Sequence, residues 1–445
     1  MTTGGSPFRR VFASLGSRNY RLYFAGQLVS QAGNWMQTVA QSFLVLELTD
    51  SGTQLGLTIA ARYLPTFLLG PWGGLFADRF NKRTVLTVTQ VSLAILALLF
   101  SVLIATDTIT IAAVYVLATA FGVANVFDVP ARQSLIGELV DRDDMANAVA
   151  LNSTTVNSAR VFGAALGGVA ASALGLAVCF GLNAVSFVVV LLCLLLMDPA
   201  RMHATERAAR ERGQIRASFR YVGRTPQLLV PLLMVGIVGA LAWEFQVTLP
   251  LMARDVFGGG AGMYGAMMAV MSAGAVLGGL LTAARRSVTT RSLAVAAMWW
   301  GVALTAAAVA PNLALEWVAL VFVGYGSVAF NALGRTILQL SARPDMRGRV
   351  MALWMIAWAG TTPIGGPIVG WVGEQFGARY SLLAGGLPTL AVGIVAYPVL
   401  SAIDARRRET EANGGHHEDQ PRNTVDQQPG LRARPADAGR PVDER

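Results

Sequence analysis

Charged side chains inside long apolar runs are the residues of this sequence most able to do chemistry. Glu244 lies midway along one run, Arg160 lies near the middle of another, and Arg62 lies in a third. Asp128 and Arg132 are four residues apart, which places them on one face of a helix. A charge at the centre of a bilayer costs about 2.5–3.5 kcal/mol or more, so such residues usually face a cavity or a partner. These five charges predict a polar cavity within a membrane.

Each charge also has a structural interpretation. Arg132 and Arg62 are near enough to a membrane surface to extend toward headgroups, and Asp128 can simply pair with an arginine. Arg160 is too deep for that and needs a buried partner or a cavity. Glu244 has no basic residue within one turn, and its affinity for a proton depends on its exposure. We therefore expect Glu244, ahead of Asp128, to bind a proton or the substrate.

Polar and aromatic residues are candidates for the walls of this cavity. Gln37 and Gln41 lie one turn apart on one helix face, and the internal repeat described below places Glu244 level with them. We expect these residues and Asn331 to contact a substrate. The aromatic walls would come from Trp35, Trp243, Phe245 and Trp358. The alternative is that these rings face lipid or pack between helices.

The elements that must position these residues are predicted to be membrane-spanning helices. The chain has 445 residues, of which 54% are hydrophobic and 14% charged, whereas a soluble domain has about 25% charged residues. Each apolar run can cross about 30 Å of hydrocarbon as a helix. The fold class is therefore all-α, a polytopic membrane protein with twelve spans. The spans lie near residues 21–49, 53–77, 84–106, 110–136, 146–172, 175–197, 228–252, 262–284, 292–311, 314–338, 349–372 and 380–403.

A long polar interruption divides these spans into two halves of six. The predicted parts are an N-terminal segment (1–20), an N-terminal half (21–197), a central loop (198–227), a C-terminal half (228–403) and a disordered tail (404–445). The central loop is expected to contain a short amphipathic helix on the membrane surface. Basic residues concentrate in the loops on one side, which predicts that both termini are cytoplasmic.

Several other classes of protein are excluded or disfavoured. The net charge of +9 comes from basic residues in short loops between apolar runs, which is not the pattern of a nucleic-acid binder. Cys179 and Cys193 lie in one run, about 21 Å apart along a helix, and cannot form a disulfide. Three histidines cannot build a metal centre, so we expect no cofactor, no metal and no enzyme active site. The sequence lacks an ATP-binding loop, which disfavours primary active transport.

The two halves of the sequence resemble each other. At an offset of 203 residues, Arg132 matches Arg335, and Gly163-x-x-x-Gly167 matches Gly366-x-x-x-Gly370. Glycines at this spacing allow helices to pack closely. A duplicated six-helix unit is typical of secondary transporters, which bind substrate where the halves meet at mid-membrane.

The loop between the second and third spans contains the most specific motif, Gly74-Leu-Phe-Ala-Asp78-Arg79-Phe-Asn81-Lys82-Arg83. Gly74 is predicted to let a neighbouring helix approach, and Asn81 to adopt the left-handed conformation of a tight turn. Asp78 lies at the C-terminal end of its helix, where the dipole disfavours an anion, so it needs an external partner. The alternative is an ordinary basic loop.

This segment closely resembles the signature loop of the major facilitator superfamily, Gly-x-x-x-Asp-Arg-x-Gly-Arg-Arg, with Asn81 in place of the second glycine. The resemblance implies that the loop helps to latch the cytoplasmic side in the outward-facing state. It assigns that role to Asp78 and Arg79. Lys82 and Arg83 complete the same latch motif. The matching loop of the second half lacks the aspartate.

Four further segments are similar to the branch that contains enterobactin-type siderophore exporters and macrolide efflux proteins. They are Gly33-Asn-Trp35-Met-Gln37, Asp128-Val-Pro-Ala-Arg132, Asp144-Met-Ala-Asn147-Ala and Asn157-x-x-Arg160-x-x-Gly163. Antiporters of the superfamily often have Gly-Pro in span 5, where this sequence has Gly163-Ala164, although span 11 has Gly366-Pro367.

The resemblance implies a proton-driven exporter of a drug, macrolide or siderophore-like molecule. Its partners would be this small molecule, protons and the lipid bilayer, and we expect a monomer in a bacterial inner membrane. The alternatives are an importer of a small solute or lipid and, outside transport, a membrane enzyme or a scaffold.

Overall fold

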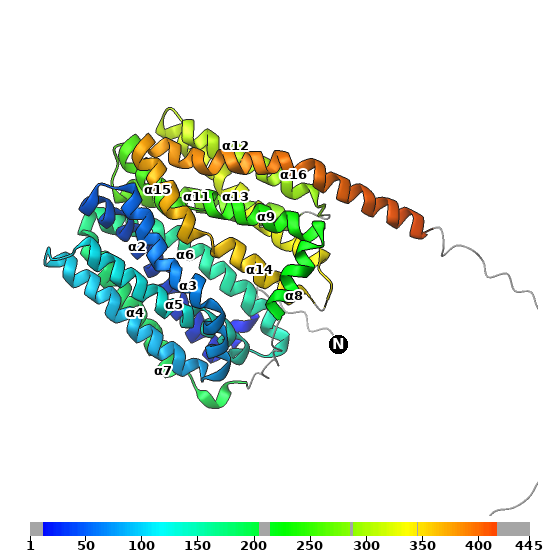
Figure 1. The fold of residues 1–445 in the computed structure, drawn as a ribbon. Coiled ribbons are helices and arrows are strands. Elements are labelled where there is room, and N and C mark those ends of the chain that lie inside the picture. Colours follow the sequence, from blue (N-terminus) through cyan, green and yellow to red (C-terminus); the bar gives the residue numbers. More distant parts are fainter. Residues whose placement is uncertain (1–11, 204–213, 285–287, 345, 416–445) are drawn as a thin grey trace, which may run out of the picture.

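The structure is a computed structural model, and it describes residues 12–203, 214–284, 288–344 and 346–415. Within these ranges every regular element is helical, so the predicted all-α fold class is confirmed. Figure 1 shows the helices lying side by side in one bundle, with the end of the last helix projecting beyond it.

The first six spans are continuous helices that agree with the predicted spans to within a few residues. Short 3₁₀ turns, η1 (Ala13–Gly16) and η2 (Arg142–Asp144), precede two of them. The helices are α2 (Arg18–Thr49), α3 (Gly52–Arg79), α4 (Lys82–Ala105), α5 (Ile111–Leu139), α6 (Met145–Leu174) and α7 (Leu176–Leu196).

The loop between α3 and α4 differs in one detail from the prediction. Asn81 has φ −62° and ψ 117°, so the predicted left-handed conformation is wrong. Its side chain instead accepts hydrogen bonds from the backbone N–H groups of Arg83 and Thr84 and caps α4. Asparagine favours this position because its carbonyl oxygen satisfies N–H groups that the first helical turn leaves unpaired.

The second half is less regular than the first. After η3 (Pro199–Arg201), its helices are α8 (Gln214–Gly223), α9 (Pro226–Ala242), α10 (Phe245–Leu251), the π-helical η4 (Met252–Val256), α11 (Ala261–Ala283), α12 (Arg291–Val309), α13 (Leu313–Ser341), α14 (Arg347–Ala359), α15 (Thr362–Phe376) and α16 (Ala378–Gly415). Two predicted spans are therefore interrupted. The seventh breaks at Trp243–Glu244 and the eleventh at Gly360–Thr361.

Two polar segments outside the predicted spans are helical. The short helix expected in the central loop is α8; its Val222 is buried, and its Tyr221 hydroxyl accepts a hydrogen bond from the Arg343 N–H beyond α13. The twelfth span, predicted at 380–403, corresponds to the apolar first part of α16, and the helix itself continues to Gly415. Alanine, arginine and glutamate dominate this extension and favour helix. The rest of the predicted disordered tail, 416–445, lies outside the described residues.

Two pairs of helices hold the two halves together. Among the described residues, eight segments are long and apolar enough to cross a membrane, namely α4, α5, α7, α9–η4, α11, α12, α13 and the first part of α16. The other predicted spans, α2, α3, α6 and α14–α15, do not meet those criteria. Helix α3 packs against α15, and α6 against α11, so these helices form the contact between the halves.

The halves meet closely at only one end of the bundle. We call the end where α3 passes into α4 the basic end, and the end where α2 passes into α3 the distal end. At the distal end, a Cβ on Gly52 would lie 2.7 Å from the Gly370 carbonyl oxygen. Toward the basic end, α14, the first part of the eleventh span, makes its main contacts with α8, α9 and α13 rather than with α3. This conformation is closed at the distal end and open toward the basic end.

Glycine contacts define the register of the internal repeat. Gly163 packs against α2, the first span, and Gly365 packs against α9, the matching span of the second half. Gly168 packs against α11, and Gly370 against α3, which are again matching spans. Both pairs are 202 residues apart. The predicted offset of 203 is wrong here, because it pairs Gly163 with Gly366, which faces α3 instead.

Candidate functional site

A polar cavity of about 140 Å³ lies mainly within the N-terminal half. Helices α2, α3, α4 and α5 supply most of its walls, and α10 of the other half contributes Gln246. Four of the residues predicted from the sequence lie together here: Trp35, Arg62, Asp128 and Arg132. The structure therefore brings cavity charges from different helices to one place.

The Asp128 carboxylate has a complete set of partners on the wall of this cavity. It accepts hydrogen bonds from the Thr89 hydroxyl (2.9 Å) and the Gln90 amide (2.8 Å) of α4. Its second oxygen lies 3.7 Å from the Arg132 Nε, and Arg132 also donates to the Gln27 carbonyl oxygen at 3.1 Å. The expected ion pair on one helix face is confirmed, and it ties α5 to α2 and α4.

Arg62 and Arg160 are placed differently from Arg132. The Arg62 guanidinium carbon lies 4.7 Å from the centre of the Phe121 ring, and its Nη1 donates a long hydrogen bond (3.5 Å) to Gln41. The Arg160 guanidinium lies 5.4 Å from the centre of the Trp35 ring. Within the described part of the chain, neither arginine has a carboxylate oxygen within 4.0 Å. Arg62 thus faces the cavity rather than extending toward headgroups.

Glu244 lies at a second place, between helices of both halves. It is only 2% exposed, in the break between α9 and α10. Cβ atoms built on Gly365 and Gly366 of α15 would lie 3.2 Å and 3.5 Å from its two carboxylate oxygens. The Oε1 atom of this carboxylate is buried and has no hydrogen-bond partner among the described atoms. Gly366 also packs against Gly56 of α3, so this carboxylate is buried where the two halves touch.

Glu244, Gln37 and Gln41 were predicted to lie at one depth and to contact a substrate, and this contact stays a prediction. None of the three is among the residues that line the polar cavity. The expectation assumed a continuous helix, and the break at Trp243–Glu244 changes the face on which later residues lie. Gln37 is buried and accepts a hydrogen bond from the Asn183 amide, which joins α2 to α7. Gln41 reaches only Arg62.

The predicted aromatic walls are also divided between two places. Trp35 lines the polar cavity. Trp243 instead packs inside the C-terminal half, with ring centres 4.8 Å from Trp300 and 6.2 Å from Trp358. The alternative of packing between helices is therefore correct for Trp243 and Trp358. Asn331 is half-buried on α13 and is not among the residues that line the cavity.

The predicted latch loop makes contacts within the N-terminal half. The Lys82 ammonium pairs with Glu138 of α5, and Arg83 donates to the Leu195 carbonyl oxygen at the end of α7. The side chain of Asp78 lies outside the described residues, and Arg79 is exposed. The close helix approach predicted for Gly74 is made by Gly73, whose Cα faces the Val126 backbone of α5. A latch between the halves stays a prediction.

Two residues of the site were missed from the sequence. The Tyr63 hydroxyl accepts a hydrogen bond from the Gln246 amide at 3.3 Å, which links the two halves across the cavity. Tyr63 also lies within electrostatic range of both Arg62 and Arg160. The sequence did contain a signal for both residues. Tyr63 directly follows Arg62, and Gln246 lies two residues after Glu244, and both of these charges are inside apolar runs.

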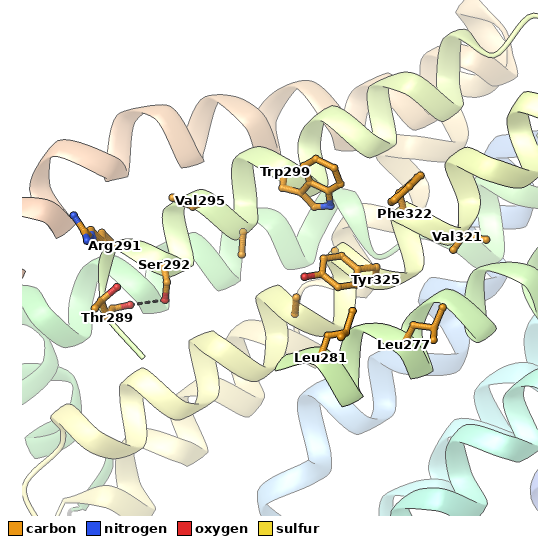
Figure 2. A pocket seen from close by; sticks show the side chains of 13 residues that line it. Leu277, Leu281, Thr289, Arg291, Ser292, Val295, Trp299, Val321, Phe322 and Tyr325 are labelled. Atoms are coloured by element: carbon orange, nitrogen blue, oxygen red, sulfur yellow. Dashed lines mark hydrogen bonds between the residues drawn. The ribbon is translucent and has the colours of Figure 1, made fainter. Parts of the chain in front are cut away.

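A larger hollow lies elsewhere and does not contain these charges. A groove of about 680 Å³ lies between α11, α12 and α13. Figure 2 shows the apolar side chains that line it, such as Leu277, Trp299 and Phe322. These side chains are about half exposed on the outside of the bundle. In a membrane-spanning protein such a surface faces lipid tails. The polar cavity, although smaller, is therefore the better candidate for a substrate site.

Helical halves in tandem, a basic loop after the second span and a charged inner cavity match one known family. The family model described as transmembrane secretion effector matches residues 9–431. The chain belongs to this family, within the major facilitator superfamily. It is therefore a multi-pass membrane transporter and not an enzyme.

Curated relatives are similar over almost their whole length. The staphyloferrin A transporter of Staphylococcus aureus is 24% identical over 399 residues, which cover 88% of this chain and 98% of the relative. The enterobactin exporter EntS of Escherichia coli O1:K1 is 24% identical over 392 residues, covering 87% of this chain and 92% of the relative. The predicted resemblance to the siderophore-exporter branch is confirmed.

Solved structures of other transporters have the same fold. A structure of the nucleoside transporter NupG is similar with a TM-score of 0.72 at 12% identity, over 86% of this chain and 98% of that chain. A bacterial homologue of the iron transporter ferroportin is similar with a TM-score of 0.68 at 14% identity, over 86% and 98% of the two chains.

Proposed function

We propose that this secondary transporter is a proton-driven exporter of an amphipathic small molecule of the siderophore, macrolide or drug type. The named functions of its relatives support this substrate class and, for the enterobactin exporter, the direction. A small-molecule substrate and a membrane location follow from the family itself. The proposal adds two properties to these, namely the outward direction of transport and its coupling to protons.

The observation that carries the proposal is the burial of Glu244 in the closed contact between the halves. Alternating access requires this contact, formed by α3, α9 and α15 at the distal side, to open in another state. Opening it would expose the carboxylate to water. The environment of Glu244 thus changes with the transport cycle, as a coupling residue requires.

The sign of the coupling follows from the cost of a buried charge. An ionised carboxylate without a cation costs several kcal/mol in a dry interface, so closing the distal end favours the protonated form. A proton taken from the distal side would promote closure, and its release toward the basic side would permit the loaded transporter to open again. With the basic end cytoplasmic, this cycle exchanges an entering proton for a leaving substrate.

The test is transport by the Glu244→Gln variant in proteoliposomes. Glutamine keeps the shape and a hydrogen-bonding group but cannot release a proton. We expect uphill flux driven by a pH gradient to be lost, while exchange of substrate for substrate at equal concentrations continues. Glu244→Asp should retain part of the coupled flux. Glu47→Gln, an exposed carboxyl near the distal end of α2, is the matched control and should transport normally.

Two results would contradict the proposal. If Glu244→Gln still concentrates substrate against its gradient, another group carries the proton, and Asp128 becomes the next candidate. If inside-out vesicles of the wild type lose a loaded substrate while right-side-out vesicles accumulate it, the protein is an importer.

A further inference from the structure

The polar cavity and its rim contain more positive than negative charge. Arg62 and Arg132 line the cavity together with one carboxylate, that of Asp128, and Arg160 lies over the ring of the lining residue Trp35. Arg132 balances Asp128 directly, at 3.7 Å. Two guanidinium groups, of Arg62 and Arg160, are left without an anion within 4.0 Å in the described part of the chain.

These two guanidinium groups lie around the same part of the cavity. Arg62 lines it directly, and Arg160 lies over the ring of Trp35, which is also a lining residue. Tyr63 is within electrostatic range of both arginines. The groups come from α3 and α6, so the fold rather than the local sequence brings them together.

Their present partners do not compensate for their burial. Each arginine lies over an aromatic ring, Phe121 for Arg62 and Trp35 for Arg160. A ring stabilises a cation far less than an ionised partner does. The Nε of Arg160 is buried without a hydrogen-bond acceptor, and the hydrogen bond from Arg62 to Gln41 is long. Guanidinium donors at this depth remain available for an anionic acceptor.

We propose that Arg62 and Arg160 bind an anionic oxygen group of the transported molecule, such as a carboxylate or a catecholate. The planar donors of arginine suit such groups, because two parallel N–H bonds can reach two oxygens. The inference rests on the proposed function in one respect, that the bound anion is part of the cargo. Tyr63 and Gln246 adjoin the site from opposite halves, so a ligand here would contact both.

The test compares two ligands of the same shape and different charge. Purified wild-type protein in lipid nanodiscs is titrated calorimetrically with 2-naphthoate and with the neutral 2-naphthamide. We expect the naphthoate to bind at least tenfold more tightly. Arg62→Gln and Arg160→Gln should each weaken naphthoate binding at least tenfold and leave naphthamide binding unchanged. Arg224→Gln, an exposed arginine outside the cavity, is the control and should bind as the wild type does.

Conservative variants separate charge from folding. Arg62→Lys and Arg160→Lys keep the positive charge and should recover part of the preference for naphthoate. Equal binding of the two ligands to the wild type, or an unchanged preference in both glutamine variants, would overturn the inference. Transport distinguishes it from the proposed function. If the protein prefers the anion but shows no proton-driven flux, the proposed export function is rejected and the anion site stands. If it exports in a proton-driven manner but shows no preference for the anion, the anion site is rejected and the proposed function stands.

Discussion

At the scale of single residues, spacing predicts partners only where the helix is continuous. Asp128 and Arg132 lie four residues apart in unbroken α5 and form the expected pair. Glu244 was expected at the depth of Gln37 and Gln41; the chain unwinds at Glu244, and its carboxylate lies against α15. Tyr63 and Gln246 could not be paired from the sequence, because no local rule joins residues of different halves.

The glycines beside Glu244 provide a test of this placement. A Cβ on Gly365 would overlap the Ala240 carbonyl oxygen and lie 3.2 Å from the Glu244 carboxylate. We expect Gly365→Ala to destabilise the described conformation by about 1–3 kcal/mol, since overpacking at a backbone contact forces the helices apart. Gly236→Ala on α9 is the control, because its Cβ would meet an atom only at 3.9 Å. Thermal unfolding in detergent measures the stability of both variants. Equal melting temperatures of Gly365→Ala and Gly236→Ala would contradict the predicted contact of α9 with α15.

At the scale of elements, apolar length predicts spans but not interruptions. All twelve predicted spans correspond to helical segments, because burying a backbone in lipid requires helix. The breaks after Ala242 and Ala359 leave the overall hydropathy unchanged, so hydropathy alone does not predict them. A proline inside a span does indicate a kink. Pro363 lies in the first turn of α15, the place in a helix where proline fits without losing a hydrogen bond.

The distal ends of two helices form a polar contact across the halves. The Glu374 carboxylate, beyond the predicted span 349–372, accepts hydrogen bonds from the Ser51 hydroxyl and from the Thr53 N–H at 2.9 Å. The Arg254 guanidinium pairs with Asp50 at 2.9 Å and completes this distal clasp. These bonds join the start of α3 to the end of α15 and the π-helical turn η4 to the end of α2, so they hold the distal end closed.

The distal clasp should respond to pH with a defined sign. Hydrogen bonds from Ser51 and Thr53 lower the pKa of Glu374 from its ordinary value of 4.5. A lowered pKa means that the carboxylate stabilises the closed clasp above pH 4.5, and that this contribution is lost as the pH falls through the lowered pKa. We expect Glu374→Gln to increase the labelling, at neutral pH, of single cysteines introduced at the distal end. The variant should also remove the dependence of this labelling on acid pH. Asp107→Asn, at the same end, is the control, and identical labelling in both variants would argue against a clasp.

At the scale of the whole molecule, the repeat and the asymmetric closure belong together. Matching glycines 202 residues apart pack matching spans, so each half is the same six-helix unit in a different setting. Composition and motifs were sufficient to predict this architecture and the family. The conformation could not be predicted from them, because composition and motifs do not specify which contacts the two halves make, here those of α3 with α15 and of α6 with α11.

The direction in which the molecule opens can be tested with two matched cysteines. Asp107 lies in an exposed loop at the distal end, and Asp143 lies in an exposed loop at the basic end. In a background with Cys179 and Cys193 replaced by serine, we expect Asp107→Cys to react with an impermeant thiol reagent added to intact cells. Asp143→Cys should react only after the cells are permeabilised, because arginine-rich loops stay in the cytoplasm. The reverse pattern would invert the topology. With the expected pattern, the described conformation opens to the cytoplasm, where an exporter must collect its substrate, and Arg62 and Arg160 lie in the cavity that receives it.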